Sequence, residues 1–197
     1  MPAAFLDAAL KCGTVAWDIE TSGLDWRSER IALCQLLVKG HGLSIVKIKK
    51  KNKVPPNLAT LLQDQSVQKI FHHAMFDLRF LCYHWNLTAR NIACTKIAAK
   101  LLDPAKREGH TLSSLVQNFL GVTLDKSSRK SDWLTWGLSP EQWQYAGNDV
   151  KYLPDLLDVL LSELDRKDRR ELALRCFAHI PTQVQLEIQG FRDIYGY

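Results

Sequence analysis

Residues 14–20 read Thr-Val-Ala-Trp-Asp-Ile-Glu, an apolar run that ends in two acidic residues. This pattern predicts a buried strand over Thr14–Ile19 that delivers Asp18 and Glu20 at its C-terminal end. In an extended chain, residues i and i+2 point to the same face, so both carboxylates project together while Ile19 points into the core. Two anions on a buried strand repel each other and lose hydration, and a divalent cation offsets both costs. For an isolated Asp-x-Glu pattern, an exposed strand end with two solvated acids is the more common interpretation.

The segments around this strand predict an α/β domain with a mixed sheet, because strands come first and helices follow. Further strands are expected over Arg30–Val38, Leu43–Ile48, Gln68–Phe71 and Ile92–Cys94, with a hairpin turn at 39–42. Helices are expected over Leu58–Leu62, Ala74–Trp85, Thr95–Leu102, Leu112–Leu120 and Arg166–Phe177. Another helix is expected to start at Ser139 and Pro140 and to run to about Val150, with further helix to Leu164. The last twenty residues form an apolar-rich tail, and the lysine-rich segment 47–53 is expected to be a solvated loop.

Composition narrows the class of protein without deciding its function. The chain has 197 residues, of which 46% are hydrophobic and 24% charged, and its formal net charge is +5. This mild basic excess is compatible with a polyanionic partner. Five scattered cysteines without a Cys-x-x-Cys pair argue against zinc ligation and a disulfide framework, and they favour reduced thiols in a cytoplasmic protein. Neither a signal peptide nor a membrane span is expected, so no membrane partner is predicted.

Two later motifs place further chemistry on predicted helices. Asp77 is a lone acid between Phe76 and Phe80 on an otherwise apolar helix face. Tyr145 and Asp149 have i,i+4 spacing, which stacks a phenol and a carboxylate on one helix face. Taken singly, a helical Asp is usually surface and a Tyr–Asp pair is usually a structural hydrogen bond.

Taken together, these acids and the residues around them resemble the tyrosine-bearing branch of the DEDD 3′→5′ exonucleases, and more closely the ribonuclease D group. The resemblance covers roughly residues 14 to 160. Besides Asp18, Glu20 and Asp77, the residues that carry the resemblance are His110–Leu115, Leu120–Val122, Leu124–Ser127, Ser131–Trp133, Leu138, Ser139, Gln142, Tyr145, Ala146, Asp149 and Val150.

Two further segments resemble the small standalone enzymes called nano-RNase C, which degrade very short RNA and assemble into rings. The residues concerned are Cys94–Ala98 and a tail with Cys176, Phe177, Ile180–Thr182, Gly190, Phe191 and Asp193–Tyr195. Arg129, Trp136 with Gly137, and Phe191 depart from the expected patterns. None of these departures touches the acidic residues, so they put substrate preference and assembly in doubt.

The resemblance implies a ribonuclease H-like fold of the DnaQ exonuclease type, with one exonuclease domain over residues 1–197, a catalytic core at about 14–160 and a helical tail at 166–197. It implies RNA degradation by two-metal hydrolysis with Mg²⁺ or Mn²⁺, acting on RNA or short single-stranded oligonucleotides, and self-association as a homo-oligomer. Asp18, Glu20 and Asp149 would hold one ion, Asp18 would bridge to the second, and Asp77 would support that ion through water. Tyr145 would orient the attacking water.

Three further residues are candidates for substrate binding, each with a structural alternative. Leu24 follows the turn at Gly23 and could wedge between the last two bases, or it could be ordinary core. His72 and His110 could contact phosphate, although a structural histidine is the more common case. Trp133 and Trp143 are expected to pack in helical or turn structure, whereas base stacking stays open for Trp136.

Other functions remain as alternatives. The chain could be a DNA 3′→5′ exonuclease, because the sequence carries no readable contact to the RNA 2′-hydroxyl. It could be a nucleic-acid-binding module without catalysis, but none of the acidic positions is missing. An endonuclease with the same fold is disfavoured by Tyr145 and the ribonuclease D pattern around it.

Overall fold

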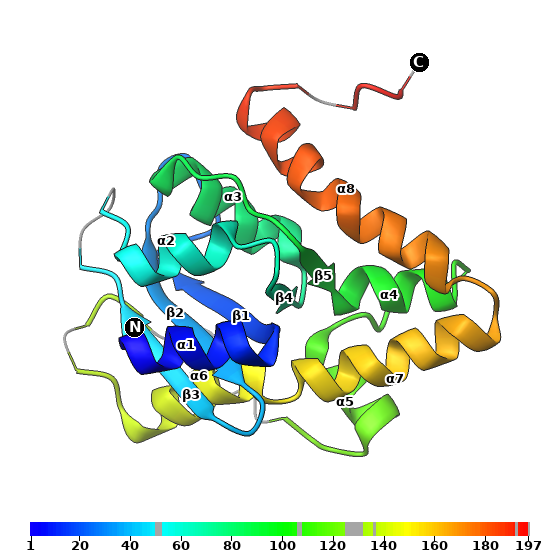
Figure 1. The fold of residues 1–197 in the computed structure, drawn as a ribbon, viewed down its shortest axis with the longest axis horizontal. Coiled ribbons are helices and arrows are strands. Elements are labelled where there is room, and N and C mark those ends of the chain that lie inside the picture. The colour runs from blue at the N-terminus through cyan, green and yellow to red at the C-terminus, as the bar shows by residue number, and fades with distance from the viewer. Residues whose placement is uncertain (50–52, 106–107, 125–131, 136, 192, 197) are drawn as a thin grey trace.

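The computed structural model describes residues 1–49, 53–105, 108–124, 132–135, 137–191 and 193–196. Five strands and eight helices lie in these residues, and Figure 1 labels them along the chain. Their bounds are α1 Ala3–Cys12, β1 Thr14–Thr21, β2 Ile31–Val38, β3 Gly42–Lys47, α2 Pro56–Gln63, β4 Gln68–Phe71, α3 Ala74–Trp85, β5 Ile92–Cys94, α4 Thr95–Leu102, α5 Leu112–Leu120, α6 Pro140–Lys151, α7 Leu153–Arg166 and α8 Arg170–Ile188.

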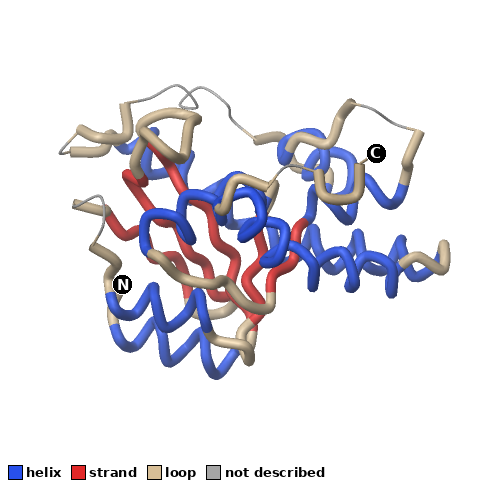
Figure 2. The backbone as a smooth tube through the Cα atoms, turned by 90° about the horizontal axis from the view of Figure 1, so that it is seen from above, coloured by secondary structure: helices blue, strands red, loops and turns tan. Residues whose placement is uncertain are grey.

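The five strands form one mixed sheet in the order β3-β2-β1-β4-β5. β1 runs antiparallel to β2 and parallel to β4, β2 runs antiparallel to β3, and β4 runs parallel to β5. Helices lie on both sides of this sheet (Figure 2). The predicted α/β class with a mixed sheet is therefore confirmed.

The two faces of the sheet bury different side chains, because successive strand residues point in opposite directions. On β2, Cys34 and Leu36 belong to the large core that includes Phe5 and Ala9 of α1. Leu33 belongs to a smaller cluster with Ala146 of α6 and with Trp133. We call these sides the α1 face and the α6 face.

Local sequence signals account for the start of α6 and the end of α5. Ser139 accepts a hydrogen bond from the Gln142 backbone N–H, and the Gln142 side chain accepts one from the Ser139 backbone, so the predicted capping box at the start of α6 is present. Gly121 ends α5 in the left-handed conformation at φ 70°, as predicted for a C-cap glycine. β4, α3, β5, α4 and α5 have the predicted bounds, and β1 runs two residues beyond its predicted end. The predicted loop at 47–53 lies partly outside the described residues, and Lys47 itself ends β3.

The predicted helix near the C-terminus was wrong. The expected helix over Arg166–Phe177 is instead the end of α7, a short turn, and α8, which continues to Ile188 through Pro181. Proline removes one backbone hydrogen bond inside a helix. Burial of Phe177, Ile180 and Val184 against the core offsets that loss. Helix α1 was not predicted, although its Phe5 and Ala9 are buried against the sheet.

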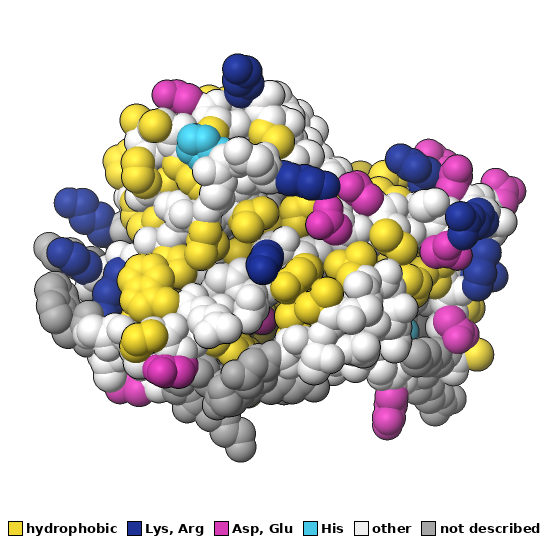
Figure 3. Space-filling view, turned by 90° about the horizontal axis from the view of Figure 1, so that it is seen from below, with side chains coloured by type: hydrophobic (Ala, Val, Ile, Leu, Met, Phe, Trp, Pro, Cys, Tyr) yellow, Lys and Arg dark blue, Asp and Glu magenta, His cyan; other side chains and the backbone are white. Residues whose placement is uncertain are grey.

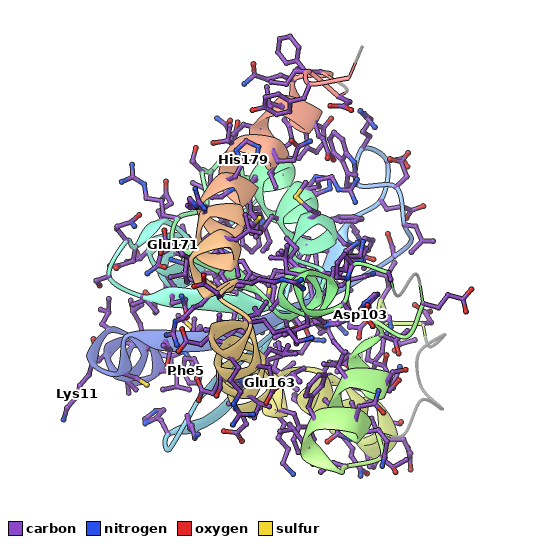
Figure 4. The ribbon with its side chains drawn as sticks, turned by 90° about the vertical axis from the view of Figure 1, so that its right-hand side faces the viewer. Phe5, Lys11, Asp103, Glu163, Glu171 and His179 are labelled. Carbon is purple, nitrogen blue, oxygen red and sulfur yellow. The ribbon has the colours of Figure 1, made fainter. Side chains whose placement is uncertain are left out.

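The turn between α7 and α8 is fixed to the end of α4. Lys167 Nζ donates to the Leu102 carbonyl, and the Arg169 guanidinium donates to the carbonyls of Leu101 and Leu102. These cations satisfy carbonyls that a helix C-terminus leaves unpaired. Figure 4 shows α8 extending beyond α7, with Glu163 on α7 and His179 on α8.

The surface mixes charge and apolar side chains. Figure 3 shows hydrophobic side chains across the middle of one face, and lysines, arginines and acids together at the end where α7 meets α8. Phe191, Ile194 and Tyr195, which follow α8, are 52%, 50% and 69% exposed. Among the described helices, none is both long and apolar enough to span a membrane.

Candidate active site

Strand β1 brings the first two acids to the α6 face. Asp18 is paired in register with Gln35 on β2, and Glu20 with Leu33. Directly paired residues of antiparallel strands point to the same face, so both carboxylates project beside Leu33, which packs with α6. The register shifts between Glu20 and Thr21. After the shift, Thr21 pairs with Ile31, and an irregularity of this kind bends the strand directly after the second acid.

Helix α3 supplies the third acid. Its N-cap residue His73 has φ 67° and ψ 43°, a left-handed conformation that is uncommon outside glycine. Asp77 follows in the first turn, where the helix dipole favours an anion. Its side chain is 2% exposed, and its Oδ1 accepts a hydrogen bond from the Ile19 backbone N–H at 3.2 Å. Because Ile19 lies between Asp18 and Glu20, this bond fixes Asp77 next to both.

Helix α6 completes the acidic group. Asp18, Glu20 and Asp149 each offer a carboxylate oxygen, and these atoms lie within 4.8 Å of one another. Among the described residues, this three-carboxylate group has the geometry of a metal site, and Asp77 lies beside it rather than in it. The sequence-predicted acids therefore come together in the structure, while their individual roles stay predictions.

Burial and mutual repulsion raise the pKa values of this group. Burial raises the pKa of Asp18 well above its usual value, and the charges of Asp77, Asp149 and Glu20 raise it further. Burial, followed by the charges of Asp149 and Asp77, raises the pKa of Glu20 to about 9. Burial also raises the pKa of Asp77, and the Asp149 charge adds to that effect. The ionised group therefore needs a compensating cation.

Tyr145 lies one helical turn before Asp149 and faces the same group. Burial, and then the charges of Asp149, Glu20 and Asp18, raise the pKa of its phenol above the usual value. The aromatic ring packs against buried Trp133, with ring centroids 5.8 Å apart. The packing prediction for Trp133 is confirmed, whereas Trp143 is 48% exposed, and Trp136 lies outside the described residues.

The three candidate substrate-binding residues have different surroundings. Leu24 is 84% exposed after β1, so the core alternative is wrong and the wedge role stays a prediction. His72 Nδ1 lies 2.9 Å from the Thr95 hydroxyl, and burial lowers the pKa of His72 to about 3. A neutral, hydrogen-bonded histidine fits the structural alternative better than a phosphate contact. His110 is buried, and its role stays a prediction.

Gln35 is a polar neighbour of the acidic group that sequence reasoning did not single out. It lies in the middle of β2, paired with Asp18, and is fully buried. The sequence feature that could have indicated a buried polar residue is a single amide inside the apolar run Ile-Ala-Leu-Cys-Gln-Leu-Leu-Val at 31–38.

Comparison with known proteins decides the family. A family profile described as 3′-5′ exonuclease matches residues 1–165. The chain belongs to the 3′-5′ exonuclease family. Exonucleases of this family use divalent metals, which agrees with the carboxylate group described above.

Two solved structures match this exonuclease over nearly its whole length. The apo form of a nuclease is 36% identical with a TM-score of 0.92, and the match covers 100% of this chain and 95% of that one. Brucella melitensis NrnC bound to pGG is 34% identical with a TM-score of 0.89, covering 96% and 92% of the two chains. The same Brucella protein has been solved with bound Mg²⁺. The predicted fold and the resemblance to nano-RNase C are confirmed.

The resemblance to the ribonuclease D group is confirmed as well. Ribonuclease D of Zymomonas mobilis is 34% identical over 109 residues, which cover 55% of this exonuclease and 27% of that protein. The exonuclease spans less than a third of the length of the first curated relatives that it matches.

Proposed function

We propose that this protein is a 3′→5′ exoribonuclease that removes nucleotides from the 3′ end of RNA or short oligoribonucleotides and releases 5′-monophosphates. One observation carries the proposal: the carboxylates of Asp18, Glu20 and Asp149 converge within 4.8 Å. Asp77 lies beside them through its bond to Ile19. The Brucella relative was solved with pGG, which supports an oligonucleotide as the substrate.

The donor set fits Mg²⁺ or Mn²⁺, because it consists of carboxylate oxygens. Asp18, Glu20 and Asp149 would hold one ion, and Asp18 together with Asp77 would support a second. When bound, the ions would supply positive charge that offsets the four carboxylates and the charge developing on the phosphate oxygens.

Tyr145 would position the water that attacks phosphorus. Its raised pKa keeps the phenol protonated at neutral pH, so it acts as a hydrogen-bonding group and not as a phenolate base. The water oxygen bonds to phosphorus and gives up a proton to solvent, the bond from phosphorus to the 3′ oxygen breaks, and that oxygen takes up a proton from solvent. The terminal nucleotide leaves as a 5′-monophosphate. Leu24, exposed directly after β1, would separate the last two bases.

A digestion panel tests this function and its alternatives. End-labelled dinucleotide, longer single-stranded RNA, single-stranded DNA and duplex are each incubated with Mg²⁺ or Mn²⁺. We expect stepwise loss of 3′ nucleotides from RNA and no cleavage of a circular single strand. Preferential trimming of DNA would make the protein a DNA exonuclease, cleavage of the circle would make it an endonuclease, and binding without hydrolysis would leave a binding module.

Self-association belongs to the same proposal. Phe177, Ile180 and Val184 are buried in the chain's own core, so much of the apolar C-terminal sequence needs no partner. Among the described residues after α8, Phe191, Ile194 and Tyr195 are exposed. Phe191 also lines a cavity of about 590 Å³ at the end of α8. We expect a homo-oligomer, and light scattering that returns 22.5 kDa at micromolar concentration would contradict this.

A further inference from the structure

Gln35 is a fully buried side chain whose polar atoms are unsatisfied. Neither its amide nitrogen nor its amide oxygen has a hydrogen-bond partner in the described part of the chain. Burying a carboxamide in this state costs free energy that an aliphatic side chain of similar size would avoid. The fold alone therefore gives no reason for an amide in the middle of β2.

The sheet register places one polar side chain directly beside Gln35. On β3 its direct neighbour is Ile45, which has no polar side-chain atom. On β1 its direct neighbour is Asp18. Paired residues of antiparallel strands have Cβ atoms about 4.5–5.5 Å apart on the same face, within reach of a glutamine amide and a carboxylate. Helix α6 packs against β1 and β2 on this face of the sheet.

The chemistry of a carboxamide suits this position. Its N–H groups can donate to Asp18 without adding another negative charge to the group formed with Glu20 and Asp149. Carboxylates that bind metals are commonly held by hydrogen bonds from a surrounding group, which fixes their orientation.

We propose that Gln35 is a positioning residue for Asp18, donating an amide N–H to one carboxylate oxygen while the other faces a divalent cation. The inference rests on the proposed function of the acidic group. It adds a residue from β2 to a site otherwise built from β1, α3 and α6.

The test separates metal binding from fold stability. Gln35→Leu removes the amide and nearly keeps the side-chain volume. Gln35→Met also removes the amide, and its flexible, unbranched side chain can fill the same space if leucine does not fit. Without metal, we expect both variants to melt at or above the wild-type temperature, because an unsatisfied buried group is gone. In calorimetric titrations with Mn²⁺, we expect about 10- to 100-fold weaker binding. Excess Mg²⁺ should largely restore the hydrolysis rate of Gln35→Leu, because the metal-binding carboxylates are all retained.

Ser44→Ala is the matched control, since it removes a buried polar group from β3. Ser44 pairs with Leu36, which points to the α1 face, so this change should leave Mn²⁺ affinity unaltered. Folded Gln35→Leu with Mn²⁺ affinity within twofold of wild type would overturn the inference while the acidic site stands. Loss of folding in both Gln35 variants would also overturn it, because the amide would then serve the fold. Absence of Mn²⁺ binding in the wild type would refute the acidic site itself.

Discussion

The two faces of the sheet are built from the same strands but differ in what they bury. On the α1 face, Trp17 of β1 stacks on Phe71 of β4, with ring centroids 6.1 Å apart, in a continuous apolar core. On the α6 face, the same β1 presents Asp18 and Glu20 to Asp149, with raised carboxyl pKa values. The apolar packing that stabilises the fold is thus concentrated on the α1 face. On the α6 face, the buried acids lower the stability of the fold, and a bound cation would offset that loss.

The largest expected effect is on activity, from Asp18→Ala. The change removes the proposed bridging carboxylate, so we expect hydrolysis to fall by several orders of magnitude while the protein stays folded. Removing one of several crowded acids should also keep the metal-free melting temperature at or above that of the wild type. Asp155→Ala, which removes an exposed acid on α7, should leave the rate unchanged. Single-turnover assays and thermal melts measure both quantities. More than about a tenth of wild-type turnover in folded Asp18→Ala would place the site elsewhere.

The reverse pattern is expected on the α1 face. Phe71→Ala empties a fully buried position and should lower the free energy of unfolding by about 3–5 kcal/mol. Leu24→Ala, at an exposed position, should change it by less than about 0.5 kcal/mol. Urea unfolding followed by circular dichroism gives both values. A Phe71→Ala variant as stable as wild type would contradict the conclusion that the α1 face supplies most of the stability.

The sequence predicts some features of the α6 face and of the C-terminal helices but not others. Strand alternation at Asp18 and Glu20, and the i,i+4 spacing of Tyr145 and Asp149, are local patterns, so the convergence of these residues could be anticipated once the family resemblance placed them together. The apolar run at 31–38 is a local pattern, but the position of Gln35 opposite Asp18 depends on the register between β1 and β2, which no local pattern encodes. The length of α8 was missed for a similar reason, because tertiary packing of its buried side chains overrides the local effect of Pro181.

A smaller effect, again on the α6 face, is expected for Tyr145→Phe. The change keeps the ring packed on Trp133 and removes only the hydroxyl. If that hydroxyl positions the attacking water, kcat should fall by roughly 10- to 1,000-fold, about 1.4–4 kcal/mol, with little change in metal affinity. Asp149→Asn should weaken metal binding as well as rate. Single-turnover rates across a Mg²⁺ titration separate the two roles, and near-wild-type chemistry in Tyr145→Phe would remove Tyr145 from the mechanism.

A further expected effect is on the pH dependence of stability. Glu20 has a pKa of about 9 in the fold against 4.5 as its reference, so between these values the metal-free native state binds more protons than the unfolded state. Stability without metal should therefore decline as pH rises through this window. Mg²⁺ should offset the decline, because it binds the ionised carboxylates. Melting temperatures with Mg²⁺ and with EDTA should diverge as pH rises, and a constant difference would contradict the raised pKa values.

The central claim is that Asp18, Glu20 and Asp149 form a divalent-metal site. Calorimetric titration of Mn²⁺ into wild-type protein and into Asp18→Asn, a neutral replacement of the same shape, tests it most directly. We expect saturable binding to the wild type and at least a tenfold loss of affinity, about 1.4 kcal/mol, in Asp18→Asn. Equal binding to the two folded proteins, or no binding to the wild type, would contradict it.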